Sequence, residues 1–279
     1  MFDVEHSDVR DVVERALTED IGTGDITSQQ TVPAELPACG TFIAKQSLIL
    51  AGVELLPLIY AARGGASVQI LRQSGASLHQ GDLIAAVVGR ARALLECERV
   101  ALNFMQRLSG VATLGRKHVD AVAGMRVKVL DTRKTTPGLR RLEKMAAAAG
   151  GVTNHRFGLF DAVLIKNNHI TAAGGVRRAL ENVTGFSGPV EIEVRTRAEL
   201  DEALSCGAQR LLLDNLTPAE AAEWIRHING RASTELSGNI NLANIREYAE
   251  AAPDFISCGA ITHSATAVDI SFRLDLNQV

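Results

Sequence analysis

The sequence predicts an α/β protein in which a small N-terminal α+β domain precedes a parallel (β/α) barrel. Three observations predict this fold. The chain has 279 residues, which is room for one large domain or two modest ones. Its first third carries short β-branched runs broken by glycine, between two helical stretches. Beyond residue 125, short apolar runs alternate with amphipathic helical stretches, the pattern of parallel strands covered on both faces.

The N-terminal part is predicted to run helix, turn, strands and helix. Residues 3–18 have apolar side chains at helical spacing, and the glycines of EDIGTGDITS (19–28) then mark a turn. Helical spacing returns in residues 91–107. We therefore expect this domain to end near Ser109 and Gly110. The runs that predict its strands are CGTFIAK, ASVQILR and GDLIAAVVG.

Six apolar runs predict the strands of the barrel. They are VKVLDT near Asp131, AVLIK at Lys166, VEIEV around Glu193, RLLLD at Asp214, TELSG at Ser237 and FISCGA at Gly259. The helical stretches between and after them are residues 139–149, 172–183, 197–205, 218–228 and 241–251. This makes six strand–helix units, or seven if residues 111–124 lead into another, and favours a barrel, complete or incomplete. A doubly wound open sheet is the alternative, but the GxGxxG and Walker A patterns are both absent from the sequence.

Charge and composition exclude several classes of function. Lys and Arg number 29 against 32 Asp and Glu, a formal net charge of −3, and aromatic residues make up only 4%. This disfavours a nucleic-acid partner, which needs basic surfaces or stacking rings. The most apolar stretch, residues 48–62, is too short to span a bilayer, and the acidic start of the chain differs from a signal peptide. Four cysteines stand far apart with no CxxC spacing. We therefore expect a cytoplasmic protein with no membrane partner.

The residues that end the predicted strands are the candidate site residues, because a (β/α) barrel has its active site at the carboxyl ends of its strands. The early strands end in cations, the middle strands in carboxylates and the last two in small residues. In chain order these residues are Arg133, Lys134, Lys166, Glu193, Asp214, Ser237, Gly238, Gly259 and Ala260. Small residues suit a phosphate site, paired carboxylates suit sugar hydroxyls or Mg²⁺, and cations suit further anionic groups. The layout predicts a phosphorylated sugar and a second anion as ligands.

Several longer motifs at and before these strand ends are specific enough to indicate a family. They are EDIGTGDIT (19–27), ERVALNFMQRLSGVAT (98–113), LDTRKTTPGLRRLEK (130–144), NHR (154–156), DAVLIKNNHI (161–170), EIEV (191–194), LLLDN (211–215), SGNI (237–240) and SCGAITHSA (257–265). With these motifs the chain resembles quinolinate phosphoribosyltransferase, also called nicotinate-nucleotide diphosphorylase (carboxylating), over nearly its whole length.

The resemblance implies a small N-terminal α+β sandwich-like domain plus an incomplete parallel (β/α) barrel. We expect the N-terminal domain in residues 1–111, the barrel catalytic domain in 112–268, and a C-terminal segment, 269–279, that packs back on the N-terminal domain. The resemblance also implies a homodimer or larger assembly, in which the neighbouring subunit completes each active site.

The reaction implied by the resemblance joins quinolinate to phosphoribosyl pyrophosphate, giving nicotinate mononucleotide, pyrophosphate and CO₂ in de novo NAD biosynthesis. Mg²⁺ accompanies phosphoribosyl pyrophosphate, and no organic cofactor is expected. Quinolinate carries two carboxylates, which fixed guanidinium groups bind bidentately. Ribosyl transfer passes through an oxocarbenium-like state, so carboxylates near the ribose stabilise its developing positive charge. Catalysis then needs mostly position and electrostatics, without a nucleophile.

The resemblance assigns residues to these tasks. The quinolinate contacts are Arg133, His155, Arg156 and Lys166, with Arg99 from the partner subunit. The catalytic set is Lys134 and Lys166 for the leaving pyrophosphate, with Glu193 and Asp214 for the ribose hydroxyls and for Mg²⁺ held largely through substrate. The 5′-phosphate contacts are Ser237, Gly238, Asn239, Gly259, Ala260 and His263.

Three residues depart from the usual family pattern. Val152 stands in a stretch that is usually all glycine, Asn167 stands where an acid is common, and Asn239 stands where glycine is common. Asn239 must therefore adopt the backbone geometry that glycine serves there, which asparagine tolerates better than most residues. His169 is expected at most to orient Lys166 or its loop.

Two other interpretations of the whole chain stay open at this point. One is a paralogue of the same fold from molybdate transport loci, whose substrate is unknown. The other is a non-catalytic barrel that binds a phosphorylated metabolite. The cations that match the quinolinate contacts favour the transferase over the paralogue, and the catalytic set favours it over the non-catalytic barrel. Three further cations, Arg140, Arg141 and Lys144, are as well explained by an ordinary solvated helix face.

Overall fold

The computed structural model describes residues 3–276 and divides them into two compact units. The N-terminal unit contains residues 3–116, 135–151 and 262–276, and the barrel unit contains residues 117–134 and 152–261. A small N-terminal domain and a parallel sheet with helices confirm the predicted fold class. Within residues 3–276, no helix is both long and apolar enough to cross a bilayer.

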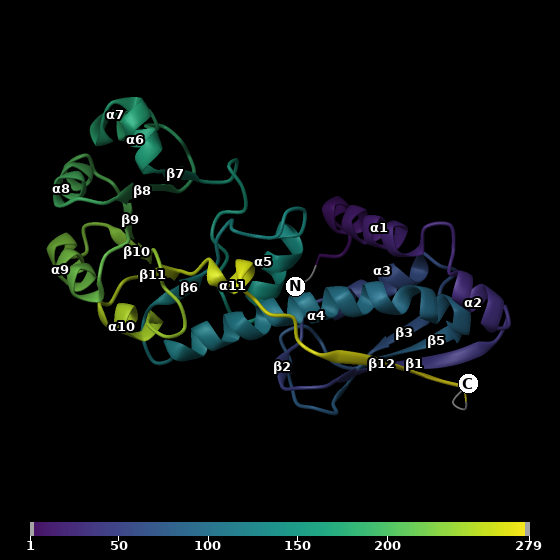
Figure 1. The fold of residues 1–279 in the computed structure, drawn as a ribbon. Helices are drawn as coiled ribbons and strands as arrows, with labels where there is room; N and C mark the ends of the chain where they lie inside the picture. Colours follow the sequence, from purple (N-terminus) through teal and green to yellow (C-terminus); the bar gives the residue numbers. More distant parts are fainter. Residues whose placement is uncertain (1–2, 277–279) are drawn as a thin grey trace. The chain divides into compact units, whose positions relative to one another are not determined.

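The N-terminal unit is built on an antiparallel sheet with the strand order β12-β1-β5-β3 (Figure 1). The four strands of this sheet are β1 (Pro37–Ala44), β3 (Ser67–Ile70), β5 (Leu83–Arg90) and β12 (Ile270–Asp275). Two short strands of the same unit, β2 (Leu48–Ile49) and β4 (Ser77–Leu78), pair with each other in a second sheet. Its helical elements are α1 (Ser7–Ile21), α2 (Ile26–Thr31), η1 (Val53–Leu55), α3 (Leu56–Ala61) and α5 (Arg140–Ala149), while α4 (Ala91–Ala121) and α11 (Ala260–His263) continue into the barrel unit. Alternate residues of β1 are buried, as a strand with one face on the core requires.

The end of the chain returns to this sheet. Strand β12 pairs antiparallel with β1, and the rings of Phe42 and Phe272 lie 4.9 Å apart between their centroids. Gly40 permits this approach, because a Cβ there would stand 2.1 Å from the Phe272 ring. Residues 277–279 of the predicted C-terminal segment lie outside the described residues.

Three expectations about the N-terminal helices need correction. The first helix runs from Ser7 to Ile21, because the extended residue His6 caps it by accepting the N–H of Asp8. The short helix α2, capped by Asp25, was not predicted. The helix predicted over 91–107 extends to Ala121, so Gly110 lies inside it. Glycine is needed at this position because a Cβ would stand 2.2 Å from the carbonyl oxygen of Thr266.

The barrel unit has six strands, all parallel, in the order β6-β11-β10-β9-β8-β7. They are β6 (Lys128–Leu130), β7 (Val163–Ile165), β8 (Val190–Val194), β9 (Arg210–Asp214), β10 (Ser233–Ser237) and β11 (Phe255–Ser257). Each lies, to within one residue, inside a run predicted to be a strand. In this sheet, β6 and β7 are the two edges, so the predicted barrel is incomplete (Figure 1).

The helices of this unit follow the strands as predicted, with one exception. They are α6 (Asn167–Ala173), α7 (Val176–Glu181), α8 (Arg197–Ser205), α9 (Pro218–Ile228) and α10 (Ile245–Glu250). The single helix predicted over 172–183 is wrong, because Gly174 (φ +85°) and Gly175 (φ +131°) end α6 and separate it from α7. Residues 111–121 continue α4, so they form no seventh strand–helix unit.

Helix α5 belongs to the N-terminal unit. Its Glu143 is fully buried and accepts from Arg107 Nε of α4 at 3.1 Å and from the backbone N–H of Thr136 at 2.9 Å. Lys144 is only 3% exposed, so it is not part of a solvated basic face. Arg141 lies 3.1 Å from the Asp8 carboxylate of α1, and Arg140 donates to Thr135 Oγ1.

Candidate active site

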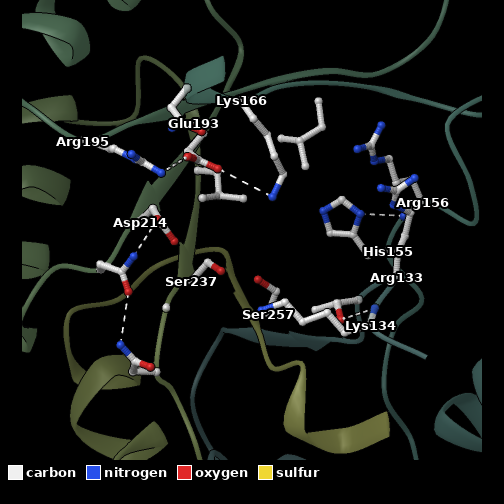
Figure 2. A pocket seen from close by; sticks show the side chains of 17 residues that line it. Arg133, Lys134, His155, Arg156, Lys166, Glu193, Arg195, Asp214, Ser237 and Ser257 are labelled. Atoms are coloured by element: carbon white, nitrogen blue, oxygen red, sulfur yellow. Dashed lines mark hydrogen bonds and ion pairs between the residues drawn. The ribbon is translucent and has the colours of Figure 1, made fainter. Parts of the chain in front are cut away.

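A cavity of about 490 Å³ opens at the carboxyl ends of the parallel strands, entirely within the barrel unit (Figure 2). Most of the sequence-predicted site residues line it: Arg133, Lys134, His155, Arg156, Lys166, Glu193, Asp214, Ser237, Gly238 and Asn239. Seven further residues complete the lining: Thr132, Leu164, Asn167, Arg195, Leu212, Asn215 and Ser257. Strand ends were therefore a sound guide to the position of this cavity.

The remaining predicted residues are not among those that line this cavity. Gly259 and Ala260 follow β11 in the barrel unit, two and three residues after Ser257. His263 belongs to the N-terminal unit, as does Arg99, which is exposed on α4. The assignments of these four residues stay predictions.

One side of the cavity concentrates positive charge. Arg133 and Arg156 lie together there, with Lys134 after the same strand as Arg133 (Figure 2). Burial and the nearby charge of Arg133 lower the pKa of Arg156, whose Nη1 donates to the carbonyl oxygen of Ala162 at 3.1 Å. Two guanidinium groups this close repel each other, and a multivalent anion between them relieves that repulsion.

The opposite side presents carboxylates. Glu193 of β8 is 4% exposed, with Oε1 3.1 Å from Arg195 Nη2 and Oε2 3.7 Å from Lys166 Nζ. Figure 2 shows the Lys166 ammonium group pointing into the middle of the cavity. Arg195 was missed by the sequence analysis, although it ends the same strand run two residues after Glu193. Arg195 thus holds the Glu193 carboxylate beside the Lys166 ammonium group.

Asp214 heads a chain of hydrogen-bonded amides that leads to the loop after β10. Asn215 Nδ2 donates to Asp214 Oδ2 at 2.7 Å, and Asn239 Nδ2 donates to Asn215 Oδ1 at 3.3 Å (Figure 2). Gly238 has φ +100°, and a Cβ there would stand 2.3 Å from Asn215 Oδ1, so glycine is required. Asn239 has φ +53°, the left-handed conformation expected for asparagine standing in place of glycine. The loop after β10 is thus connected, through Asn215, to Asp214 at the end of the neighbouring strand β9.

His155 reaches the cavity from the loop before β7. The buried carboxylate of Asp131 holds this loop, because Oδ1 accepts the N–H of His155 at 2.8 Å and Oδ2 accepts Asn154 Nδ2 at 2.6 Å. His155 Nε2 lies 3.3 Å from Glu191 and 3.5 Å from Glu235, two buried acids that the sequence analysis did not select. Burial opposes a charged ring, but these two carboxylates outweigh it and raise the pKa of His155 to about 9.

These three side chains have the composition of a metal site, but their charges are already partnered. The ligand-type atoms of His155, Glu191 and Glu235 lie within 4.8 Å of one another. Arg210 binds both acids, with Nε 3.0 Å from Glu191 Oε1 and Nη2 2.7 Å from Glu235 Oε2. A divalent cation would have to displace or oppose that guanidinium, so the group is an internal ion network.

His169 acts on the loop that carries Lys166. Its Nδ1 accepts the backbone N–H of Lys166 at 2.9 Å at the start of α6. It is not among the residues that line the described cavity, whereas Asn167 is. This contact orients the backbone from which Lys166 projects.

Comparisons with known proteins agree with this geometry. The family model for the quinolinate phosphoribosyl transferase C-terminal domain matches residues 111–273, and the model for its N-terminal domain matches residues 25–109. A mitochondrial quinolinate phosphoribosyltransferase [decarboxylating] 2a of Nicotiana tabacum is 40% identical, covering 96% of this chain and 82% of that protein. A probable nicotinate-nucleotide pyrophosphorylase [carboxylating] of Bacillus subtilis (strain 168) is 38% identical, covering 98% and 95% of the two chains.

The fold is also shared with solved structures of proteins bearing these names. The nicotinate-nucleotide pyrophosphorylase of Francisella tularensis superposes with a TM-score of 0.92 at 35% sequence identity, over 96% of both chains. The predicted resemblance is thereby confirmed over both units. The chain belongs to the quinolinate phosphoribosyltransferase family.

Proposed function

We propose that this chain transfers the phosphoribosyl group of phosphoribosyl pyrophosphate to quinolinate and releases CO₂, forming nicotinate mononucleotide for NAD biosynthesis. One observation carries the proposal: a single cavity sets the cations Arg133 and Arg156 opposite the carboxylates Glu193 and Asp214, with Lys166 pointing between them (Figure 2). An anionic heterocycle suits the first group and a ribose suits the second. The names of the homologous proteins support the same reaction.

The cationic side is the proposed quinolinate site. Quinolinate is a dianion at neutral pH, and each of its carboxylates can accept two parallel N–H bonds from a guanidinium group. Arg133 and Arg156 supply two such groups, and His155 adds a ring whose pKa is raised by its acidic neighbours. With both carboxylates of quinolinate fixed, its ring nitrogen points at C1 of the ribose. The two reactants are then held together, so the step becomes effectively unimolecular.

The reaction needs no enzyme nucleophile. The pyridine nitrogen forms a bond to C1 of the ribose as the bond from C1 to pyrophosphate breaks, and the bonding pair leaves with pyrophosphate. The ribosylated nitrogen is then positive. When CO₂ leaves, the electron pair of the carbon–carboxylate bond stays on C2, where the adjacent positive nitrogen stabilises it, and C2 then takes up a proton. Glu193 and Asp214 stabilise positive charge on the ribose, while Lys134 and Lys166 stabilise the departing pyrophosphate.

The cavity fits Mg²⁺ bound mainly through the substrate. The Asp214 carboxylate, the Asn215 amide oxygen and the Ser237 hydroxyl are oxygen donors of the kind Mg²⁺ prefers, directly or through water. Glu193 has its two oxygens near Arg195 and Lys166, so it offers less free coordination capacity than Asp214. When bound, Mg²⁺ neutralises phosphate charge. We propose no organic cofactor.

The proposal extends to the assembly. We propose a homodimer or larger, in which Arg99 serves the cavity of the partner subunit. Arg99 is exposed on α4 and does not line the cavity within its own barrel unit, which leaves it available for that role. We retain the cytoplasm as the predicted location.

Incubation of the purified protein with quinolinate, phosphoribosyl pyrophosphate and Mg²⁺ tests the function. We expect nicotinate mononucleotide, detected by mass, only when all three are present with active protein. Tight binding of phosphoribosyl pyrophosphate without any product would instead favour the non-catalytic barrel.

Nicotinate is expected to be a poor substrate because it lacks the 2-carboxylate. Leaving a buried guanidinium or imidazolium unpaired in a complex costs about 2–5 kcal/mol, which predicts a kcat/KM at least roughly 30-fold lower than for quinolinate. Initial rates with each pyridine at saturating phosphoribosyl pyrophosphate measure this ratio. Comparable values for the two substrates would show that the cations do not act as a dicarboxylate clamp.

A further inference from the structure

Charged side chains fill the inside of the barrel beneath the cavity, where apolar layers are usual. Parallel barrels pack their interiors mainly with Val, Ile and Leu. Here Glu191 of β8 and Glu235 of β10 occupy that space with 4% and 0% exposure. Burying two carboxylates costs free energy, and exchanging such a network for apolar side chains is often neutral or stabilising. The network therefore calls for a functional explanation.

Arg210 of β9 fixes the geometry of both acids. Its Nε lies 3.0 Å from Glu191 Oε1, and its Nη2 lies 2.7 Å from Glu235 Oε2. The guanidinium carbon also stands 4.4 Å from the centroid of the Phe255 ring, which supports it from β11. One planar cation thus holds two carboxylates in place, Glu191 through Oε1 and Glu235 through Oε2.

His155 is the second cation that the network needs. When both acids are ionised, two carboxylates and one guanidinium leave one negative charge, which a protonated imidazole balances. Burial and the nearby Glu235 raise the pKa of Glu191, so its ionised form depends on the cations beside it. Its Nε2 is within 3.5 Å of both acids, at 3.3 Å from Glu191 Oε2 and 3.5 Å from Glu235 Oε2. The His155 side chain is 12% exposed and lines the cavity, so the balancing charge lies at the cavity floor.

We propose that Glu191, Arg210 and Glu235 are positioning residues that keep the His155 ring fixed and positively charged toward a carboxylate of quinolinate. The proposal rests on the proposed function and deepens it. None of these three is among the residues that line the described cavity, so they act through His155. The network would keep quinolinate affinity nearly constant across the neutral pH range.

The other ring nitrogen couples this charge to the ligand. Nδ1 of His155 accepts the backbone N–H of Arg156 at 2.7 Å, a contact that suits the neutral ring. In the charged ring Nδ1 carries a proton as well and becomes a hydrogen-bond donor. A carboxylate of quinolinate in the cavity accepts from such a donor. The two acids favour the charged ring and the Arg156 amide favours the neutral ring. The acids prevail, so the ring is charged before a dicarboxylate binds.

Other charged groups near the ring contribute to its titration. From below they are Glu191, Arg210 and Glu235, and from the loops and strand ends around the cavity they are Asp131, Arg133, Arg156, Lys166 and Glu193. Cations predominate around the cavity and oppose a charged ring. The charge on His155 therefore depends on the acids below it, and on Glu235 as the more completely buried of the two.

The variant Glu235→Gln tests the proposal because it removes one charge and keeps the size of the side chain. The dissociation constant of quinolinate, measured by calorimetry from pH 6 to 9, is the readout. For the native protein we expect little change up to about pH 8.5, because the pKa of His155 is raised to about 9 and its charged form persists below that value. For Glu235→Gln we expect about 10- to 100-fold weaker binding at pH 8.5, the usual range for a lost charged hydrogen bond, and a smaller deficit at pH 6.

A double variant separates charge from structural damage. Adding Arg210→Met to Glu235→Gln leaves Glu191 with His155 as its only cation, so the charges balance again. We expect most of the lost affinity at pH 8 to return, whereas structural damage would accumulate. Glu220→Gln, the same chemical change in the capping box of α9, is the matched control and should bind like the native protein. If Glu235→Gln alone does not fold, the double variant and Arg210→Gln test the proposal instead. Arg210→Gln removes a cation and keeps both acids beside His155, so quinolinate affinity should not be lost at a lower pH than in the native protein.

Two results would overturn the proposal. One is a Glu235→Gln variant that binds as the native protein does at every pH, and the other is an equal loss at every pH with no recovery in the double variant. Failure of the proposed function looks different, because the native protein itself would then fail to bind quinolinate.

Discussion

Lys166→Ala is expected to lower kcat/KM about 10²- to 10³-fold, the range seen when one preorganised group that stabilises developing charge is removed. Lys166 Nζ lies 3.7 Å from Glu193 Oε2 and projects into the cavity, between the proposed quinolinate and phosphoribosyl sites (Figure 2). Its loss removes a cation from the leaving pyrophosphate and leaves Glu193 with Arg195 as its remaining ion-pair partner in the described structure. Steady-state rates with both substrates varied measure the effect.

Lys128→Ala is the matched control. Lys128 is exposed at the first residue of β6, the opposite end of the sheet from the cavity, so its removal should leave kcat/KM unchanged. Circular dichroism should show both variants folded. A Lys166→Ala enzyme within fivefold of the native kcat/KM would remove Lys166 from the catalytic set.

Mixing Arg99→Ala with Lys166→Ala subunits is expected to restore activity that neither variant has alone. In the proposed shared site, a heterodimer has one cavity with Lys166 from its own chain and Arg99 from the partner. The other cavity lacks both residues. With random pairing of equal amounts, half of the dimers are heterodimers, so the mixture should recover about a quarter of the native activity.

The mixture must be co-refolded or co-expressed so that subunits exchange, and native mass spectrometry confirms the heterodimer. If each cavity used Arg99 of its own chain, every site in the mixture would carry a defect. A confirmed heterodimer with no more activity than either parent would therefore assign Arg99 to an ordinary exposed position on α4.

The outline of the cavity could be predicted because parallel strands put their last residues at one edge of the sheet. Reading the end of each apolar run identified Lys166, Glu193 and Asp214 without knowledge of the strand order, and the structure brings them to one cavity. Asn239 was also foreseen, since only a residue tolerant of a left-handed backbone can replace glycine there.

The network below the cavity could not be predicted in this way. Glu191 and Glu235 lie inside β8 and β10, and Arg210 begins β9. A charge in such a short run gives no sign of which face it occupies. Their meeting depends on the register of three strands that are distant in sequence. Arg195 was missed for a simpler reason, because Glu193 was taken as the functional residue at the end of this strand and the residues after it were not considered.

Two errors in the helices have different causes. The helix predicted over residues 91–107 continues to Ala121, and Gly110 within it lets the carbonyl oxygen of Thr266 approach too closely for any Cβ. That contact joins segments far apart in the chain and leaves no local signal. The break between α6 and α7 did have a local signal, the adjacent glycines Gly174 and Gly175. The prediction of one helix over 172–183 relied on amphipathic spacing and ignored this pair.

The most direct test of the central claim follows the carboxylate that the reaction removes. Quinolinate labelled with ¹³C in its 2-carboxylate is incubated with the native protein and Mg²⁺, with and without phosphoribosyl pyrophosphate. The account predicts labelled CO₂, pyrophosphate and unlabelled nicotinate mononucleotide in equal amounts, and no labelled CO₂ when phosphoribosyl pyrophosphate is omitted. Release of labelled CO₂ without phosphoribosyl pyrophosphate, or a nucleotide product that retains the label, would contradict it.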